Sequence, residues 1–226
     1  MEHRIAIISD THSLLRPEIK EILNTCEVIL HSGDIASQKT IEEIKNITTT
    51  YFVKGNADKY IEDDIPEQLE LILYGVRFYM IHNKKQRKEN LSDVDIFIYG
   101  HSHKYEEIKK EGTLYLNPGS CGPRRFRQPI TMAVLTIEDE TKHYSIEKIQ
   151  CSNGGKEVIE PKLSEKDMDK LIKAIMKDMN MGRDVETIAR KNQVELEFVN
   201  QILQIYTTHP GIDTDGILNR MDIWGK

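Results

Sequence analysis

The chain has 226 residues, 38% of them hydrophobic and 7% aromatic, with a formal net charge of -6 at pH 7. The apolar fraction is enough for a packed core, the length fits one medium domain with a small appendage, and the acidic balance excludes a general attraction to nucleic acid or to an anionic membrane. The cysteines at positions 26, 121 and 151 form no C-x-x-C pair, which excludes a disulfide framework and a cysteine zinc cage.

The start of the chain carries no membrane-directed segment. Met1 to Arg4 leads directly into a predicted strand without a signal-peptide core, and no run of about 18 apolar residues follows anywhere. We therefore expect an unprocessed, soluble protein of the cytoplasm, where its three thiols stay reduced.

The first part of the sequence predicts strands that alternate with helices. Apolar runs at residues 4–8, 28–31 and 51–53 predict strands, and helices are expected between them at residues 17–24 and 38–46. This order makes two β-α-β units. Such units must set their strands parallel and side by side.

Beyond residue 65 the pattern changes to hairpins. Residues 69–73 and 76–81 flank the dipeptide Tyr74-Gly75, which indicates two strands around a tight turn. Further strands are predicted at residues 95–99, 113–117, 131–137 and 143–149. Two facing mixed sheets flanked by helices would bury all these runs.

The C-terminal part of the sequence predicts helices only. Apolar residues recur at helical spacing from Leu163 to Met179, and the segment from Val185 to Leu203 imitates a helix-turn-helix. The tail has 10 Lys or Arg against 11 Asp or Glu, so it lacks the basic footprint of a nucleic-acid reader. We divide the chain into a main domain, residues 1–161, and a helical, helix-turn-helix-like extension, residues 162–226, which serves docking or homo-oligomer formation. Nucleic acid and membrane are not expected as partners.

Residues able to bind metal follow directly after five of the predicted strands. They are Asp10, His12, Asp34, Asn56, His82, His101 and His103. Open α/β sheets bind ligands at the carboxyl ends of their strands, so all seven side chains are expected at one rim. A shared carboxylate with imidazoles and an amide oxygen suits two divalent ions held close together. The sequence therefore predicts a dinuclear metal site.

The order D-x-H, G-D, G-N, H and G-H-x-H resembles the calcineurin-like metallophosphoesterases, and within them the small phosphodiesterases of the YfcE type. The resemblance covers roughly residues 1–150. It implies a four-layer α/β/β/α sandwich for the main domain, to which this chain adds a small all-α module. It also implies one metal ion held by Asp10, His12, Asp34 and His103 and a second held by Asp34, Asn56, His82 and His101.

The activity that the resemblance implies is a metal-dependent phosphodiesterase acting on a small phosphoester. A metal-activated hydroxide would attack phosphorus, with Asp34 as the bridge between the ions and Asp34 and Asn56 as catalytic side chains. Manganese is the first expectation for both ions, and nickel, iron, zinc and magnesium are the alternatives. The alternative functions are a phosphatase, a hydrolase of nucleotides or dinucleoside polyphosphates, and a non-catalytic interaction protein on the same fold.

Ala57 departs from the pattern of the wider family. Many phosphatase branches have a histidine after Gly-Asn that can protonate the leaving group, whereas this chain has Ala57. The small phosphodiesterase branch often lacks that histidine too, so Ala57 favours this branch and leaves the general acid unidentified.

Two basic residues are candidate substrate contacts. Lys84 lies just beyond His82, where it would reach a second phosphate of the substrate, although a solvated helix start also explains it. Arg124 follows a turn rich in Pro and Gly and would pair with a phosphate oxygen at two points, although a surface role explains it equally well.

Overall fold

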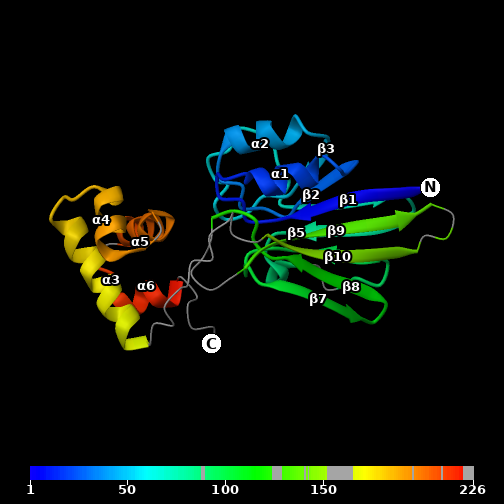
Figure 1. Cartoon of the computed structure of the whole chain (residues 1–226). Helices are drawn as coiled ribbons and strands as arrows, with labels where there is room; N and C mark the ends of the chain where they lie inside the picture. Colours follow the sequence, from blue (N-terminus) through cyan, green and yellow to red (C-terminus); the bar gives the residue numbers. More distant parts are fainter. Residues whose placement is uncertain are drawn as a thin grey trace. The chain divides into compact units, whose positions relative to one another are not determined.

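The computed structural model of the chain describes residues 1–87, 90–123, 129–139, 141, 143–151, 165–194, 196–209 and 211–220 (Figure 1). These residues build two compact units. The first contains the described residues up to 151 and all the strands among them, and the second contains the described helices from residue 165 onward. The predicted boundary at residue 161 lies outside the described residues, so a division at that position stays a prediction.

The first sheet has five strands in the order β10-β9-β1-β2-β3. They are β1 (Glu2–Ile8), β2 (Val28–His31), β3 (Thr49–Phe52), β9 (Ile130–Glu138) and β10 (Tyr144–Cys151). β1, β2 and β3 run parallel, with Ile5 opposite Val28 and Ile8 opposite His31, as the predicted β-α-β units require. β9 and β10 complete the sheet in antiparallel pairings. The carboxyl ends of β1, β2 and β3 consequently meet at one edge.

Helices α1 (Pro17–Leu23) and α2 (Gln38–Lys45) pack on the outer face of this sheet. Side chains alternate between the two faces of a strand, and Ala6 of β1 points toward the helices. It belongs to one buried cluster with Ile19 of α1 and Ile41 of α2. The helices therefore fix the outer face of the sheet and leave its other face for the second sheet.

The second sheet has the order β4-β5-β6-β8-β7. Its strands are β4 (Gln68–Leu73), β5 (Val76–Ile81), β6 (Ile96–Ile98), β7 (Tyr105–Lys110) and β8 (Thr113–Pro118). β5, β6 and β8 run parallel, and β4 and β7 pair with them antiparallel. The turn before β5 holds Tyr74 at φ 50° and Gly75 at φ 79°, the left-handed pair of a two-residue hairpin. The predicted hairpin is confirmed.

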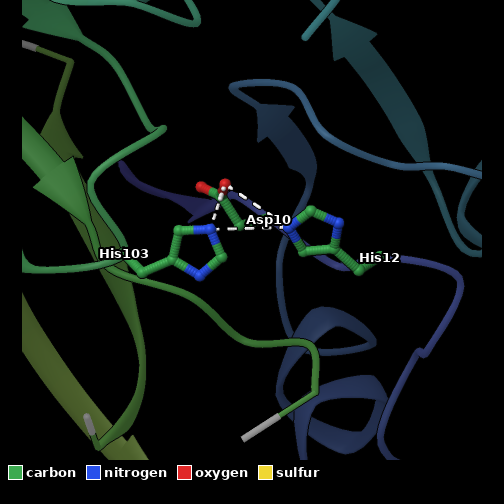
Figure 2. Close-up of side chains that lie close together, drawn as sticks. All are labelled: Asp10, His12 and His103. Atoms are coloured by element: carbon green, nitrogen blue, oxygen red, sulfur yellow. Dashed lines mark hydrogen bonds and ion pairs between the residues drawn. The ribbon is translucent and has the colours of Figure 1, made fainter. Parts of the chain in front are cut away.

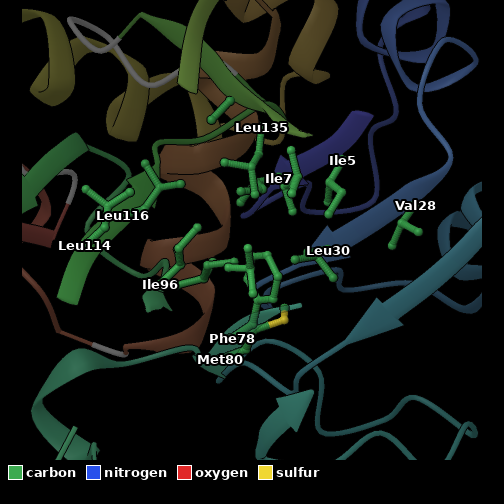
Figure 3. Close-up of a cluster of buried hydrophobic side chains, with 14 of the residues drawn as sticks. Ile5, Ile7, Val28, Leu30, Phe78, Met80, Ile96, Leu114, Leu116 and Leu135 are labelled. Carbon is green, nitrogen blue, oxygen red and sulfur yellow. The ribbon is translucent and has the colours of Figure 1, made fainter. Parts of the chain in front are cut away.

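The two sheets face each other across the main core (Figure 3). Ile5, Ile7 and Leu30 come from the first sheet, Phe78 and Met80 come from the second, and none of these side chains is more than 1% exposed. Burial of each such side chain contributes about 1.5 to 3 kcal/mol. The predicted pair of facing mixed sheets is therefore confirmed.

The other face of the second sheet carries aromatic side chains. Tyr79, Phe97 and Tyr99 are almost fully buried there and form a cluster with Leu91. In the described part of the chain, the segment that follows β5 begins with a short 3₁₀ helix, η1 (Lys84–Gln86), and continues as a loop toward β6. A short turn and a loop thus lie over this face, whereas α-helices lie over the first sheet.

The regular elements among the described residues of the C-terminal unit are all helices. Its helices are α3 (Glu165–Asn180), α4 (Val185–Asn192), α5 (Leu196–Thr208) and α6 (Thr214–Arg220). Met168 and Ile172 of α3, Val199 of α5 and Ile217 of α6 belong to one buried core. Gln193, at φ 54°, ends α4 and turns the chain toward α5, which gives the predicted helix-turn-helix-like pair. No helix among the described residues combines the length and apolarity needed to cross a membrane.

One buried carboxylate ties α3 to α4. Asp178 is 1% exposed, and both of its oxygens accept hydrogen bonds from Nζ of Lys191 at 2.8 Å. Arg183 pairs with the same carboxylate. A buried charge without partners is strongly destabilising, so these two cations make the position of Asp178 compatible with the fold.

Candidate metal centre

Each predicted ligand follows the carboxyl end of a strand. Asp10 follows β1, Asp34 follows β2 and Asn56 follows β3, while His82 follows β5 and His101 follows β6. Because these strands are parallel within each sheet, their ends come together at one edge. The seven side chains therefore come from both sheets.

The backbone turns sharply at this edge. Five of the seven residues adopt left-handed backbone angles: Asp10 (φ 55°), His12 (φ 42°), Asp34 (φ 56°), His101 (φ 70°) and His103 (φ 57°). Such a conformation costs about 1 to 2 kcal/mol for each non-glycine residue. Strain of this kind persists where the surrounding structure fixes it, often at functional sites.

Asp10, His12 and His103 form one tight group (Figure 2). Oδ1 of Asp10 lies 3.0 Å from Nε2 of His103 and 3.8 Å from Nε2 of His12, and the two Nε2 atoms are 3.4 Å apart. The other oxygen of Asp10 accepts from the hydroxyl of Ser9 at 2.5 Å and from the backbone N–H of His101 at 3.2 Å. Oδ1 is thereby left to face the two imidazoles.

Asp34 connects this group to a second one. Its Oδ2 lies 3.4 Å from Nε2 of His82 and 3.8 Å from Nε2 of His12, and its Oδ1 accepts from the backbone N–H of Ala57 at 2.8 Å. Asp10, Asp34 and His82 also place one ligand atom each within 4.8 Å of one another. One carboxylate oxygen therefore faces imidazoles of both groups.

The tautomer of His82 is determined by the hydrogen bond at Nδ1, the ring nitrogen that points away from Asp34. Nδ1 lies 2.8 Å from the backbone oxygen of Ser32, which can only accept, so Nδ1 carries a hydrogen. Whenever the ring is neutral, its lone pair is therefore on Nε2, the nitrogen nearer Asp34. Burial disfavours the charged ring, but contact with Asp34 and the charges of Asp10 and Asp34 outweigh burial and raise the pKa of His82 to about 9. The surroundings of the His82 ring therefore favour a positive charge.

Asn56 and His101 form an exposed pair beside these groups. Oδ1 of Asn56 lies 3.1 Å from Nδ1 of His101, and the His101 ring meets the His82 ring edge-on at 5.3 Å between centroids. Both side chains are exposed. All seven predicted residues are thus at this edge, with the carboxylates buried and the amide on the solvent side.

The donor atoms fit divalent cations. Oδ1 of Asp10 and Nε2 of His82 are buried, and neither makes a hydrogen bond within the part of the chain that the structure describes, although buried polar atoms are almost always paired. Burial disfavours charge on Asp10, yet attraction from His103 holds the pKa of Asp10 below its ordinary range. A cation between these atoms would satisfy the lone pairs, and this mixture of oxygen and nitrogen donors suits borderline divalent metals.

His31 links two of the loops that carry these residues. Its Nδ1 accepts from the backbone N–H of Gly33 at 3.2 Å, and its Nε2 lies 3.0 Å from the hydroxyl of Thr11. Burial lowers the pKa of His31 to about 4, so the ring is neutral and Nε2 donates to Thr11. His31 thus connects the segment of Asp10 and His12 to that of Asp34.

Sequence reasoning gave no role to Asp58. The structure buries this residue completely, and its carboxylate accepts hydrogen bonds from backbone N–H groups of both the Asp34 and the Asn56 segments. The only sequence signal was an acidic residue in a turn of small residues after a strand. That pattern is common in solvated turns.

The two candidate substrate contacts have different outcomes. Nζ of Lys84 lies 2.5 Å from Oε2 of Glu106 and 4.9 Å from the ring centre of Tyr99, so the lysine has an intramolecular partner. It lines a hollow of about 370 Å³ with Lys85, Arg87 and Tyr115, and none of the seven predicted ligands lines that hollow. Arg124 lies outside the described residues.

Comparisons with known proteins identify the family that the first unit resembles. Residues 3–140 match the calcineurin-like phosphoesterase superfamily domain. A probable metallophosphoesterase of Methanothermobacter thermautotrophicus is 27% identical over 150 residues, which cover 60% of this chain and 87% of that protein. A phosphodiesterase of Methanocaldococcus jannaschii is 30% identical over 142 residues, which cover 52% of this chain and 84% of that protein.

A solved structure shares the fold. Vacuolar protein sorting 29 from Cryptosporidium parvum superposes with a TM-score of 0.55 at 20% identity, covering 67% of this chain and 99% of that one. At this identity the likeness supports the fold alone.

Proposed function

The chain belongs to the calcineurin-like phosphoesterase superfamily, and we propose that this metal-dependent phosphoesterase hydrolyses phosphodiesters at a centre for two divalent ions. The observation that carries the proposal is the position of Asp34, whose Oδ2 faces His82 at 3.4 Å and His12 at 3.8 Å. A carboxylate between two groups of imidazoles is the arrangement that two neighbouring cations require. Family relatives named as phosphodiesterases support the substrate class.

We propose the two sets of ligands that the family resemblance implies. The first ion would be held by Asp10, His12, Asp34 and His103, and the second by Asp34, Asn56, His82 and His101. Support for the first set is the triangle of Asp10, His12 and His103. Support for the second is the contact of Asp34 with His82 and of Asn56 with His101. Manganese is the first candidate metal for both positions.

When bound, two such ions polarise the phosphoryl oxygens, lower the pKa of a water molecule and stabilise the charge of the transition state. The protein's own contribution is to hold the donor atoms in place. The carbonyl of Ser32 orients the His82 ring, and the N–H of Ala57 orients Asp34. Partners of this kind raise metal affinity by fixing the ligand geometry.

Substrate would approach from the side of Asn56 and His101. These two side chains are exposed, whereas Asp10 and His103 are buried, so the open side of the cluster is the side of the amide. Ala57 follows Asn56 and offers no proton to a leaving group. A departing oxygen would therefore leave with help only from metal, water or a neighbouring arginine.

Lys84 and Arg124 are proposed as contacts for a second anionic group of the substrate. For Lys84 the contact would compete with the ion pair to Glu106, so a substrate phosphate must attract Lys84 more strongly than this half-buried carboxylate does. If Lys84 acts in this way, Lys84→Ala should raise KM for a substrate with two phosphates and leave KM for a simple diester unchanged.

We also propose that the enzyme works in the cytoplasm. Cys26, Cys121 and Cys151 are free thiols, which fits the reducing cytoplasm. The C-terminal helices would then mediate docking or association with a second copy of the chain.

The test is a matrix of metals against substrates on metal-stripped protein. We expect two equivalents of Mn²⁺ per chain and turnover of activated phosphodiesters that exceeds turnover of the matching monoesters. Faster turnover of monoesters would favour a phosphatase, and faster turnover of nucleotides or dinucleoside polyphosphates would favour that hydrolase. Binding of metal without any turnover would favour an interaction protein of the same fold and would contradict the proposed activity.

A further inference from the structure

The carboxylate of Asp58 is surrounded by backbone donors. The side chain is 0% exposed and lies two residues after Asn56. Its four partners are the N–H groups of Ile35 (2.7 Å) and Ala36 (2.7 Å) at Oδ1 and of Asp34 (2.9 Å) and Gly55 (2.8 Å) at Oδ2. All four acceptor contacts connect Asp58 to the segments that carry Asp34 and Asn56.

The same two segments are also bonded in the reverse direction. Asp58 accepts from the backbone of Asp34, and the side chain of Asp34 accepts from the backbone of Ala57 at 2.8 Å. Each segment thus offers a carboxylate to the backbone of the other. Gly55 and Ala57 are the chain neighbours of Asn56, and the N–H of each donates to one of these carboxylates. The backbone of Asn56 is therefore fixed on both sides.

The segments lie too close together for a side chain at position 55. A Cβ atom on Gly55 would lie 2.2 Å from Oδ1 of Asp34 and 2.3 Å from its backbone nitrogen. Asp34 and Ala36 adopt left-handed angles of 56° and 66°, and such turns direct successive N–H groups into one concave anion site. In this protein the anion is a side chain of the chain itself.

We propose that Asp58 is the positioning residue that sets the bridging carboxylate of Asp34 and the amide of Asn56 before any ion binds. The inference rests on the proposed function, because it assigns Asp58 to the affinity of that metal centre. Replacement of a partner that orients a metal ligand typically costs 10-fold to 100-fold in metal affinity. The loss should appear in metal binding and be overcome by excess metal, because Asp58 touches neither substrate nor ion.

The experiment is a calorimetric titration of Mn²⁺ into metal-stripped, full-length protein. It compares the wild type with Asp58→Asn, which keeps one acceptor oxygen and turns an amide toward the other N–H groups. The matched control is Asp63→Asn, because Asp63 follows in the same loop but pairs with Lys45 at 3.2 Å and Gln38 at 3.1 Å. Circular dichroism of each metal-free variant reports its fold.

We expect Asp58→Asn to bind Mn²⁺ roughly 10-fold to 100-fold more weakly and to regain kcat near that of the wild type at saturating metal. Asp63→Asn should match the wild type in both respects. On an Asp34→Asn background the same change should cost less affinity than in the wild type, because only the positioning of Asn56 is then lost, whereas a merely structural role would cost as much as before. If Asp58→Asn does not fold, Asp58→Glu, which keeps the charge and displaces it by one methylene, is measured in the same way.

The outcomes separate the two proposals. A folded Asp58 variant that binds Mn²⁺ as tightly as the wild type overturns the inference and leaves the proposed function intact. A wild type that binds no divalent ion defeats the proposed function itself. Equal loss of affinity on the wild-type and Asp34→Asn backgrounds also overturns the inference.

Discussion

Oδ2 of Asp34 lies 3.4 Å from Nε2 of His82, while the far nitrogen of that ring is bound to the carbonyl of Ser32. The imidazole therefore cannot rotate to another partner without losing a buried hydrogen bond. This contact joins a ligand from the first sheet to a ligand from the second.

Asp34→Asn should abolish most turnover and preserve the fold. An amide cannot neutralise two cations, and two-metal stabilisation of a transition state is worth several kcal/mol, so roughly a tenth of wild-type activity or less should remain at saturating metal. Turnover of an activated diester and circular dichroism measure the two effects. Retention of more activity than that would refute the shared-carboxylate assignment.

Gly100→Ala should disturb Asp10 and lower metal affinity. An added Cβ would lie 2.0 Å from Oγ of Ser9 and 2.8 Å from Oδ2 of Asp10, so the carboxylate must shift. The control is Gly112→Ala, where φ is 91° and nothing lies within 4 Å of the new atom. That variant should lose about 1 to 2 kcal/mol of unfolding free energy from backbone strain alone and bind metal normally. Equal metal affinity in both variants would contradict the packing argument.

Turnover should depend steeply on the leaving group. With Ala57 after Asn56, no side chain at that position donates a proton, so aryl and phosphate leaving groups should react faster than simple alkyl alcohols. General acid catalysis is typically worth 10² to 10⁴ in rate. The measurement is a series of diesters of graded leaving-group pKa, with Ala57→His as the comparison. A flat dependence in the wild type would indicate a general acid elsewhere in the site.

Stability should depend on pH through His3. Its ring lies 2.9 Å from Glu27 and 3.1 Å from Asp139. Hydrogen bonding to Glu27, and next to Asp139, raises the pKa of His3 above 6.5, and the His3 contact lowers the pKa of Glu27 below 4.5. A raised histidine pKa stabilises the fold fully below the unfolded value, and this contribution is lost as pH rises through the folded value. For Glu27 the contribution is lost as pH falls.

The His3 pair should therefore stabilise the first unit most between about pH 4.5 and 6.5, the unperturbed values of the two groups. His3→Gln compared with wild type in chemical denaturation across pH gives the difference directly. That difference should shrink above pH 6.5 as the wild-type ring loses its proton. A difference that grows with pH would reverse the assigned sign.

Truncation near Pro161 should leave the metal centre intact. All seven proposed ligands precede residue 104, and every contact described among them lies within the first unit. We expect the shortened chain to bind two ions and to hydrolyse a small activated diester, while association or solubility changes. Loss of both ions on truncation would refute the domain division.

A point variant in the full chain tests whether destabilising the helical unit, without removing it, affects the metal centre. In the full chain, Asp178→Asn removes the carboxylate shared by Lys191 and Arg183, and it should destabilise the helical unit without altering Mn²⁺ affinity. A strong rise in KM for the natural substrate in the truncated chain alone would indicate that the tail contributes to substrate binding.

Local sequence patterns predicted the elements that depend on local chemistry. The apolar run ending at Ile8 located β1 and hence Asp10, and Tyr74-Gly75 located the hairpin because two left-handed residues are needed there. Asp58 could not be found in this way. Three of its four donors belong to a loop more than twenty positions earlier, and no periodicity or composition encodes a contact between two irregular segments.

Lys84 shows the same limit for charged side chains. Its place after His82 predicts a contact with phosphate, but nothing in the sequence indicated the ion pair with Glu106 of β7 at 2.5 Å. The strand order β6-β8-β7 brings that glutamate close to Lys84. The order of strands in a sheet cannot be predicted from the sequence of a single strand.

The stacking of His3 on Tyr74 has a mechanical consequence for the sandwich. The two rings are 3.6 Å apart and nearly parallel, and they join the start of β1 to the turn before β5. At the other ends of the same two strands, Asp10 and His82 converge on the metal centre. An aromatic stack thus joins the two sheets at one end of their shared core, and the proposed ions would join them at the other end. Removing those ions would loosen only the end that they hold. Ions that bind only the folded state raise the unfolding temperature with their concentration.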